Sequence, residues 1–163
     1  MRHTITVLVE NEFGVLSRIS GLFSGRGFNI DSLSVAPTNE ETMSRMTIVT
    51  RGDEQILEQI TKQLNKLIDV IKVIDFTDGS AIEREIALIK VTAEDESRAE
   101  VLRIADIFRA KIIDVTPRSY TIEATGAPTK IDAILELLRP IGLKEIVRSG
   151  PVAIGRGAKG WKG

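Results

Sequence analysis

The feature of this sequence that most restricts its fold is the order of the strands and helices predicted in the first half of the chain. Alternating apolar residues predict strands over residues 3–9, 28–33, 43–49 and 70–76. Apolar residues at helical spacing predict a helix that opens at Gly14 and a second helix capped by Asp53. The order strand, helix, strand, strand, helix, strand is typical of the ferredoxin-like fold, in which both helices cover one face of an antiparallel sheet. The sequence therefore predicts an α+β domain.

The same pattern returns after a polar segment at residues 77–80. Strands are predicted over residues 85–92, 111–115, 120–124 and 143–147, and helices over 100–108 and from 128 or 129 onward. We therefore expect two ferredoxin-like βαββαβ domains in tandem, residues 1–78 and 79–163, with a flexible tail from Gly155. Each half is near the lower size limit for a stable core. The halves are expected to need each other or a partner.

Charge and composition exclude several classes of function. The 22 basic and 23 acidic residues give a net charge of −1, so no overall field attracts nucleic acid or an anionic membrane. The absence of cysteine excludes disulfides and thiolate chemistry, and a single histidine, His3, excludes a histidine-rich metal site. The N-terminal apolar run is too short for a signal peptide, and no stretch approaches the roughly 18 to 20 apolar residues of a membrane helix. A cytoplasmic location is the expectation.

The first predicted helix carries candidate binding groups at both ends. The backbone N–H groups of Gly14, Val15 and Leu16 have no partner within the helix, and the helix dipole favours an anion there. Asn11 lies just before this turn and Asn29 just after the helix, and each amide offers donors and acceptors. This set suits a zwitterion, with its carboxylate on backbone N–H groups and its ammonium on side-chain oxygens. These residues are also ordinary turn and cap residues, so both interpretations stay open at this point.

Two motifs resemble the ACT domain, a small amino-acid-sensing module. They are the segment NEFGVL at residues 11–16 and the segment RGFNI at residues 26–30. Together with residues 32–38, 44–48 and 112–115 in the same order, they make the whole chain similar to the small regulatory subunit of acetolactate (acetohydroxyacid) synthase. The resemblance covers essentially all 163 residues.

The resemblance implies a homodimer whose N-terminal ACT domains pair their sheets side by side. The turn at residues 11–16 of one chain would then face Asn29 and Ile30 of the other. The implied effector is a branched-chain amino acid, usually valine, with apolar neighbours around its aliphatic side chain. The effector-binding residues implied in this chain are Asn11, Gly14, Val15, Leu16, Asn29 and Ile30.

The resemblance also implies what the chain does. The small subunit of this family has no catalytic residues. It binds the thiamine-diphosphate-dependent catalytic subunit, raises its activity and confers feedback inhibition in branched-chain amino acid biosynthesis. Thiamine diphosphate, Mg and FAD are expected in that partner, and no cofactor is expected in this chain. The second half has other residues at 97–100 and 109–111, where the first half has its turn and its glycine loop, so only the first half is expected to bind ligand.

Three other functions fit the sequence less well. A free-standing amino-acid-binding module or transcriptional regulator would use the same fold, but no helix-turn-helix segment or basic recognition helix is predicted. RNA binding would need aromatic residues on the central strands, where Phe28 and Tyr120 are isolated, and the basic end with Arg156, Lys159, Trp161 and Lys162 is expected to be a flexible tail. An enzyme would need a nucleophile, base and acid set, and the acidic pairs lie in polar or exposed segments.

Overall fold

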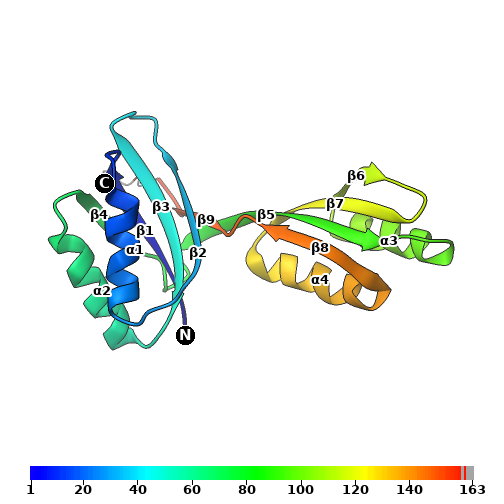
Figure 1. Cartoon of the computed structure of the whole chain (residues 1–163), viewed down its shortest axis with the longest axis horizontal. Helices are drawn as coiled ribbons and strands as arrows, with labels where there is room; N and C mark the ends of the chain where they lie inside the picture. Colours follow the sequence, from blue (N-terminus) through cyan, green and yellow to red (C-terminus); the bar gives the residue numbers. More distant parts are fainter. Residues whose placement is uncertain (159, 161–163) are drawn as a thin grey trace. The chain divides into compact units, whose positions relative to one another are not determined.

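The computed structural model describes residues 1–158 and residue 160, and they form two compact units (Figure 1). The first unit contains residues 1–82 together with the segment that starts at Val152, and the second contains residues 83–151. The sequence placed the boundary after residue 78 and the end of the chain in the second domain. In the structure the boundary lies inside strand β5, because this strand begins at Ala81 and continues through it.

The first unit has the predicted ferredoxin-like order of elements. They are β1 (Arg2–Glu10), α1 (Val15–Gly25), β2 (Ile30–Pro37), β3 (Met43–Arg51), α2 (Glu54–Lys66) and β4 (Val70–Asp75). The strands form an antiparallel sheet in the order β2-β3-β1-β4. Strand β1 is central, with Val7 opposite Met46 of β3 and Val73 of β4. Strand β2 is an edge strand.

Both helices of the first unit pack on one face of its sheet (Figure 1). The Oδ1 atom of Asp53 accepts a hydrogen bond from the backbone N–H of Ile56 at 2.9 Å, which confirms the predicted cap of α2. The core is formed by alternate strand residues and by one apolar stripe of each helix: Ile5, Val7, Val9, Val15, Ile19, Phe23, Met46, Ile48, Leu57, Ile60 and Leu64.

The opposite face of this sheet is covered in part by the chain that returns from the second unit. Residues Val152–Gly155 form β9, a short strand that the sequence did not predict and that pairs with β5. The Arg45 side chain projects from this face and donates from Nη2 to the carbonyl oxygen of Ala153 at 2.8 Å. The backbone N–H of Arg156 donates to the carbonyl oxygen of Ser80 at 3.0 Å. Lys159, Trp161 and Lys162, expected in the flexible tail, lie outside the described residues.

The second unit repeats the fold. Its elements are β5 (Ala81–Thr92), α3 (Glu96–Ile107), β6 (Lys111–Val115), β7 (Ser119–Gly126), α4 (Pro128–Gly142) and β8 (Leu143–Arg148). The antiparallel order β6-β7-β5-β8 matches the order of the first sheet. Its core joins Ala87, Ile89 and Val91 of β5 to apolar residues of α3, β7 and α4. Within the described chain, every helix is too short or too polar to cross a lipid bilayer.

Candidate functional site

The turn before α1 has the geometry of a site for an anion. Gly14 has φ +84° and ψ −4°, a left-handed conformation that favours glycine, and α1 starts at the next residue. No side chain caps this helix. The N–H of Val15 reaches the carbonyl oxygen of Glu12 only at 3.5 Å, and the N–H groups of Gly14 and Leu16 have no acceptor among the described residues. These donors and the positive end of the helix dipole face the same space.

Asn11 holds this turn against the connection between β2 and β3. Its Nδ2 atom donates to the carbonyl oxygen of Glu41 at 3.1 Å, and its backbone N–H donates to the carbonyl oxygen of Thr42 at 2.8 Å. With Nδ2 engaged, the Oδ1 atom is left as an acceptor for a ligand. The ammonium group of an amino acid is a suitable donor for it.

An ion pair lies beside Gly14. The Nε and Nη2 atoms of Arg18 donate to Oδ2 of the buried Asp69 at 2.9 and 2.5 Å. A Cβ atom on residue 14 would lie 3.2 Å from Nη1 of Arg18, so the glycine leaves the space next to this guanidinium open. Carboxylate oxygens of Glu10, Glu12 and Asp69 lie within 4.8 Å of one another. Because Asp69 is already paired and the other two are exposed, we assign no metal to them.

The other predicted half of the site lies at the far end of α1. Asn29 is exposed, and its carbonyl oxygen accepts a hydrogen bond from Oγ1 of Thr50 at 2.7 Å. Ile30 is half-buried and starts β2. The helix has 11 residues, so at about 1.5 Å per residue its two ends are roughly 16 Å apart. A single amino acid cannot contact both ends within one chain.

Not every residue that was predicted to line the site can contact a ligand with its side chain. The side chain of Val15 is 3% exposed and belongs to the core, so only its backbone can contact a ligand. Leu16 is 41% exposed. Phe13, which was not predicted as a site residue, is fully exposed in the turn next to Gly14. The signal for it was a large aromatic residue inside an otherwise polar turn.

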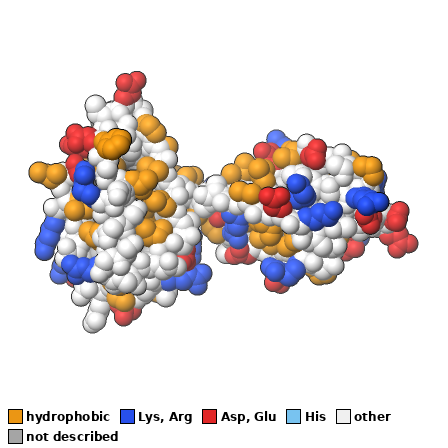
Figure 2. Space-filling model, in the orientation of Figure 1, with side chains coloured by type: hydrophobic (Ala, Val, Ile, Leu, Met, Phe, Trp, Pro, Cys, Tyr) orange, Lys and Arg blue, Asp and Glu red, His pale blue; other side chains and the backbone are white. Residues whose placement is uncertain are grey.

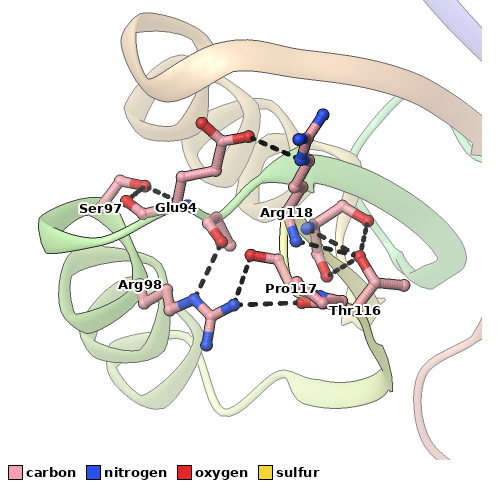
Figure 3. A network of polar contacts seen from close by, with 8 residues as sticks. Glu94, Ser97, Arg98, Thr116, Pro117 and Arg118 are labelled. Carbon is pink, nitrogen blue, oxygen red and sulfur yellow. Dashed lines mark hydrogen bonds and ion pairs between the residues drawn. The ribbon is translucent and has the colours of Figure 1, made fainter.

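In the second unit, the loop before α3 corresponds to the turn before α1. Hydrogen bonds from the side chain of Arg98 hold this loop (Figure 3). Its Nε atom donates to the carbonyl oxygen of Ala93 at 3.1 Å, and Nη2 donates to the carbonyl oxygens of Thr116 and Pro117. The N–H of Ser97, in the first turn of α3, donates to the carbonyl oxygen of Glu94 at 3.0 Å. The backbone N–H that is open at Leu16 in the first unit is therefore used internally at the corresponding Ser97 in the second.

Strand β2 is an edge strand of the sheet of the first unit. One side of β2 pairs with β3, and no strand of the described chain pairs with its other side. Val35 is 44% exposed on this edge, and hydrophobic side chains are visible on the first unit in the region of β2 and β3 (Figure 2). An exposed edge strand is suited to pairing with another strand.

The fold and this strand-turn-helix geometry define an ACT-type α+β domain followed by a second domain of the same topology. A family model described as "AHAS small subunit-like ACT domain" matches residues 5–72, and one described as "Small subunit of acetolactate synthase" matches residues 84–157. The acetolactate synthase small subunit of Haemophilus influenzae is 56% identical over 160 residues, with 98% of each chain covered. The isozyme 3 small subunit of Salmonella typhimurium is 53% identical over 160 residues, again with 98% of each covered.

A solved structure agrees with these sequence relatives. The crystal structure of the acetolactate synthase small subunit from Thermotoga maritima matches with a TM-score of 0.87 and 40% identity, covering 98% of this chain and 99% of that one. The chain belongs to the family of acetolactate synthase small subunits.

Proposed function

We propose that this chain is the non-catalytic regulatory subunit of acetolactate synthase in branched-chain amino acid biosynthesis. It forms a homodimer, binds valine between its ACT domains, activates the catalytic large subunit and makes that subunit sensitive to the end product. The family assignment supports the subunit role, and the turn around Gly14 supports the effector role.

One observation carries the dimeric site. Asn11 and Asn29 lie at opposite ends of an 11-residue helix, so they act on one ligand only if each comes from a different chain. A two-fold axis that pairs the β2 edges brings the N-terminal end of one α1 toward the C-terminal end of its copy. Two equivalent sites result from this arrangement.

The chemistry of the turn fits a small zwitterion. The carboxylate takes the N–H groups of Gly14 and Leu16, and the ammonium takes side-chain amide oxygens such as Oδ1 of Asn11. The exposed part of Leu16 and the half-buried Ile30 contact the aliphatic side chain. Valine, leucine and isoleucine share this chemistry, and valine is the effector that we propose.

A site that spans two chains also accounts for regulation. An effector shifts an equilibrium only when it binds one arrangement of the dimer more tightly than another. Closure around valine changes the relative placement of the two chains, and the catalytic subunit responds to that placement. Thiamine diphosphate, Mg and FAD belong to the catalytic partner in this proposal, and this chain holds none of them.

Calorimetry of the full chain with L-valine tests the proposal. We expect saturable binding at about one site per chain and its loss in Asn29→Ala. Co-purification with the catalytic subunit, followed by an acetolactate synthase assay with and without valine, tests the partner. Valine binding without any association with the catalytic subunit would favour a free-standing amino-acid-binding regulator. Absence of both would contradict the proposed function.

A further inference from the structure

The sheet face opposite the helices of the first unit mixes the buried apolar residues Leu8 and Val49 with polar ones. By the strand register, Thr4, Thr6, Ser34 and Thr47 lie on this face together with Arg45. The hydroxyl of Thr6 is fully buried and has no hydrogen-bond partner among the described residues. Buried hydroxyls are normally hydrogen-bonded, so the Thr6 hydroxyl on this face needs an explanation.

Arg45 is a charged residue on this face of the sheet. Its side chain is half-buried between the sheet and the segment that contains β9, and its Nη2 atom donates to the carbonyl oxygen of Ala153. No carboxylate of the described residues pairs with it. Burial lowers the pKa of Arg45, because it removes water from around the guanidinium. A guanidinium has five N–H donors in a planar fork, so most of its donors are available to an anion.

A cavity of about 660 Å³ lies next to Arg45 within the first unit. Three cationic side chains line it: Arg45, Lys72 of β4 and Arg156. The acidic residue in the lining is Asp75, whose Oδ1 atom accepts hydrogen bonds from the backbone N–H and the hydroxyl of Thr77. The lining therefore carries an excess of positive charge.

The backbone adds donors at the same cavity. Gly157 has φ +87°, so the chain turns there in a conformation that favours glycine. The N–H groups of Gly157 and Ala158 have no acceptor among the described residues. A glycine turn with open N–H groups beside basic side chains is a common way to hold an anionic group.

We propose that this cavity binds a small anion with at least two negative charges, through Arg45, Lys72, Arg156 and the backbone at residues 157–158. The shared chemistry is a cluster of negative oxygens, as in a phosphate or a polycarboxylate. The anion joins the sheet to the segment after β9, because its ligands come from both. The site is separate from the proposed valine site and does not depend on it.

Calorimetry with the full chain tests this site, with pyrophosphate and citrate as probes at constant ionic strength set by NaCl. We expect saturable binding of at least one probe at about one site per chain, weakened roughly tenfold or more by Arg45→Met. Arg103→Met, which removes an exposed arginine of α3 in the second unit, is the matched control and should bind like the unaltered chain. The preferred probe identifies the class of anion.

Two further measurements keep the test decisive. If thermal melting shows that Arg45→Met is unfolded, Lys72→Met and Arg156→Met replace it, and each should weaken binding severalfold. The Nε–H signal of Arg45 in an NMR spectrum should shift on titration, whereas that of Arg103 should not. No saturable binding of either probe, or equal affinity in Arg45→Met and Arg103→Met, would overturn the proposal. Valine binding by the same variants reports separately on the effector site.

Discussion

The side-chain amide of Asn11 donates from Nδ2 to the carbonyl oxygen of Glu41, 3.1 Å away, although the residues are 30 positions apart. This bond joins the turn before α1 to the connection between β2 and β3. It also fixes which way the amide faces, so that Oδ1 is the atom left for a ligand. The proposed effector site therefore depends on contacts outside its own strand-turn-helix segment.

Replacing Asn11 by alanine tests this dependence. We expect Asn11→Ala to weaken L-valine binding by roughly tenfold or more, about 1.4 kcal/mol, because a ligand contact and the anchor of the turn are both lost. The free energy of unfolding should fall by less than about 1 kcal/mol, because the residue is exposed. Asn65→Ala, an exposed asparagine of α2, is the control for calorimetry and thermal melting. Unchanged valine affinity in Asn11→Ala would rule out this role.

Gly14→Asp should abolish valine sensitivity. The substitution places a Cβ 3.2 Å from Nη1 of Arg18 and a carboxylate where the effector's carboxylate would bind. Gly79→Asp is a matched control, since Gly79 has a similar φ of +81° and a Cβ atom added there would meet no other atom within 4 Å. Both variants should lose about 1 kcal/mol of stability from the left-handed backbone, and only the first should lose valine binding. Full inhibition of the holoenzyme by valine in Gly14→Asp would contradict the site.

The pair between Asp69 and Arg18 should contribute to the stability of the first unit. Asp69 is 6% exposed, whereas the side chain of Arg18 is 48% exposed, so solvent screens part of the interaction. We expect Asp69→Asn to lower the free energy of unfolding by about 1 to 2 kcal/mol. Glu58→Gln removes an exposed pair with Lys62 on α2 and should cost less than about 0.5 kcal/mol. Equal losses in urea unfolding would show that burial of Asp69 is unimportant.

Acid titration of Asp78 should report the hydrogen bonds in the turn that precedes β5. Hydrogen bonds from the side chain and the backbone N–H of Ser80 lower the pKa of Asp78 from its usual value of 3.8. Because the folded pKa lies below the unfolded one, the stabilisation is present above the unfolded pKa and is lost as the pH falls through the folded pKa. The carboxyl ¹³C signal of Asp78 should titrate below 3.8, and Ser80→Ala should move the midpoint upward. An unchanged midpoint in Ser80→Ala would contradict this cause.

The sequence predicted the fold well because both halves have strong periodicity. The alternation in residues 3–9 and the stripe from Ile56 to Leu67 leave few alternatives, and the strand order follows from the order of elements. Strand β9 was missed because its four residues, Val152–Gly155, are too few for an alternation to stand out. The sequence predicted that this helix starts at Glu100, but α3 starts at Glu96. Its first turn is polar and therefore lacks the apolar spacing that predicts a helix. Hydrogen bonds between the Ser97 hydroxyl and the backbone of Glu94 stabilise this turn.

The candidate site was predictable only in part. Gly14 and Asn11 were identified from residue type and position, and the structure gives them the expected turn. The sequence could not show that the Val15 side chain belongs to the core, because helical spacing of apolar residues does not show which of them are fully buried. The Arg18–Asp69 pair also escaped prediction, since its residues are 51 positions apart and meet only through packing. The half-burial of Arg45 was unpredictable for the same reason, because its partner Ala153 is 108 positions away.

The most direct test mixes two variants that each damage a different half of the proposed site. Asn11→Ala and Asn29→Ala chains carrying different affinity tags are refolded together, and mixed dimers are isolated through both tags. Each pure variant dimer should bind L-valine at least roughly tenfold more weakly than the unaltered dimer. The mixed dimer should bind about one valine per dimer in calorimetry, because one site then combines the unaltered turn of one chain with the unaltered strand of the other. If the mixed dimer has no site of unaltered affinity, the site does not span two chains. If either pure variant binds valine normally, the replaced asparagine is not part of the site.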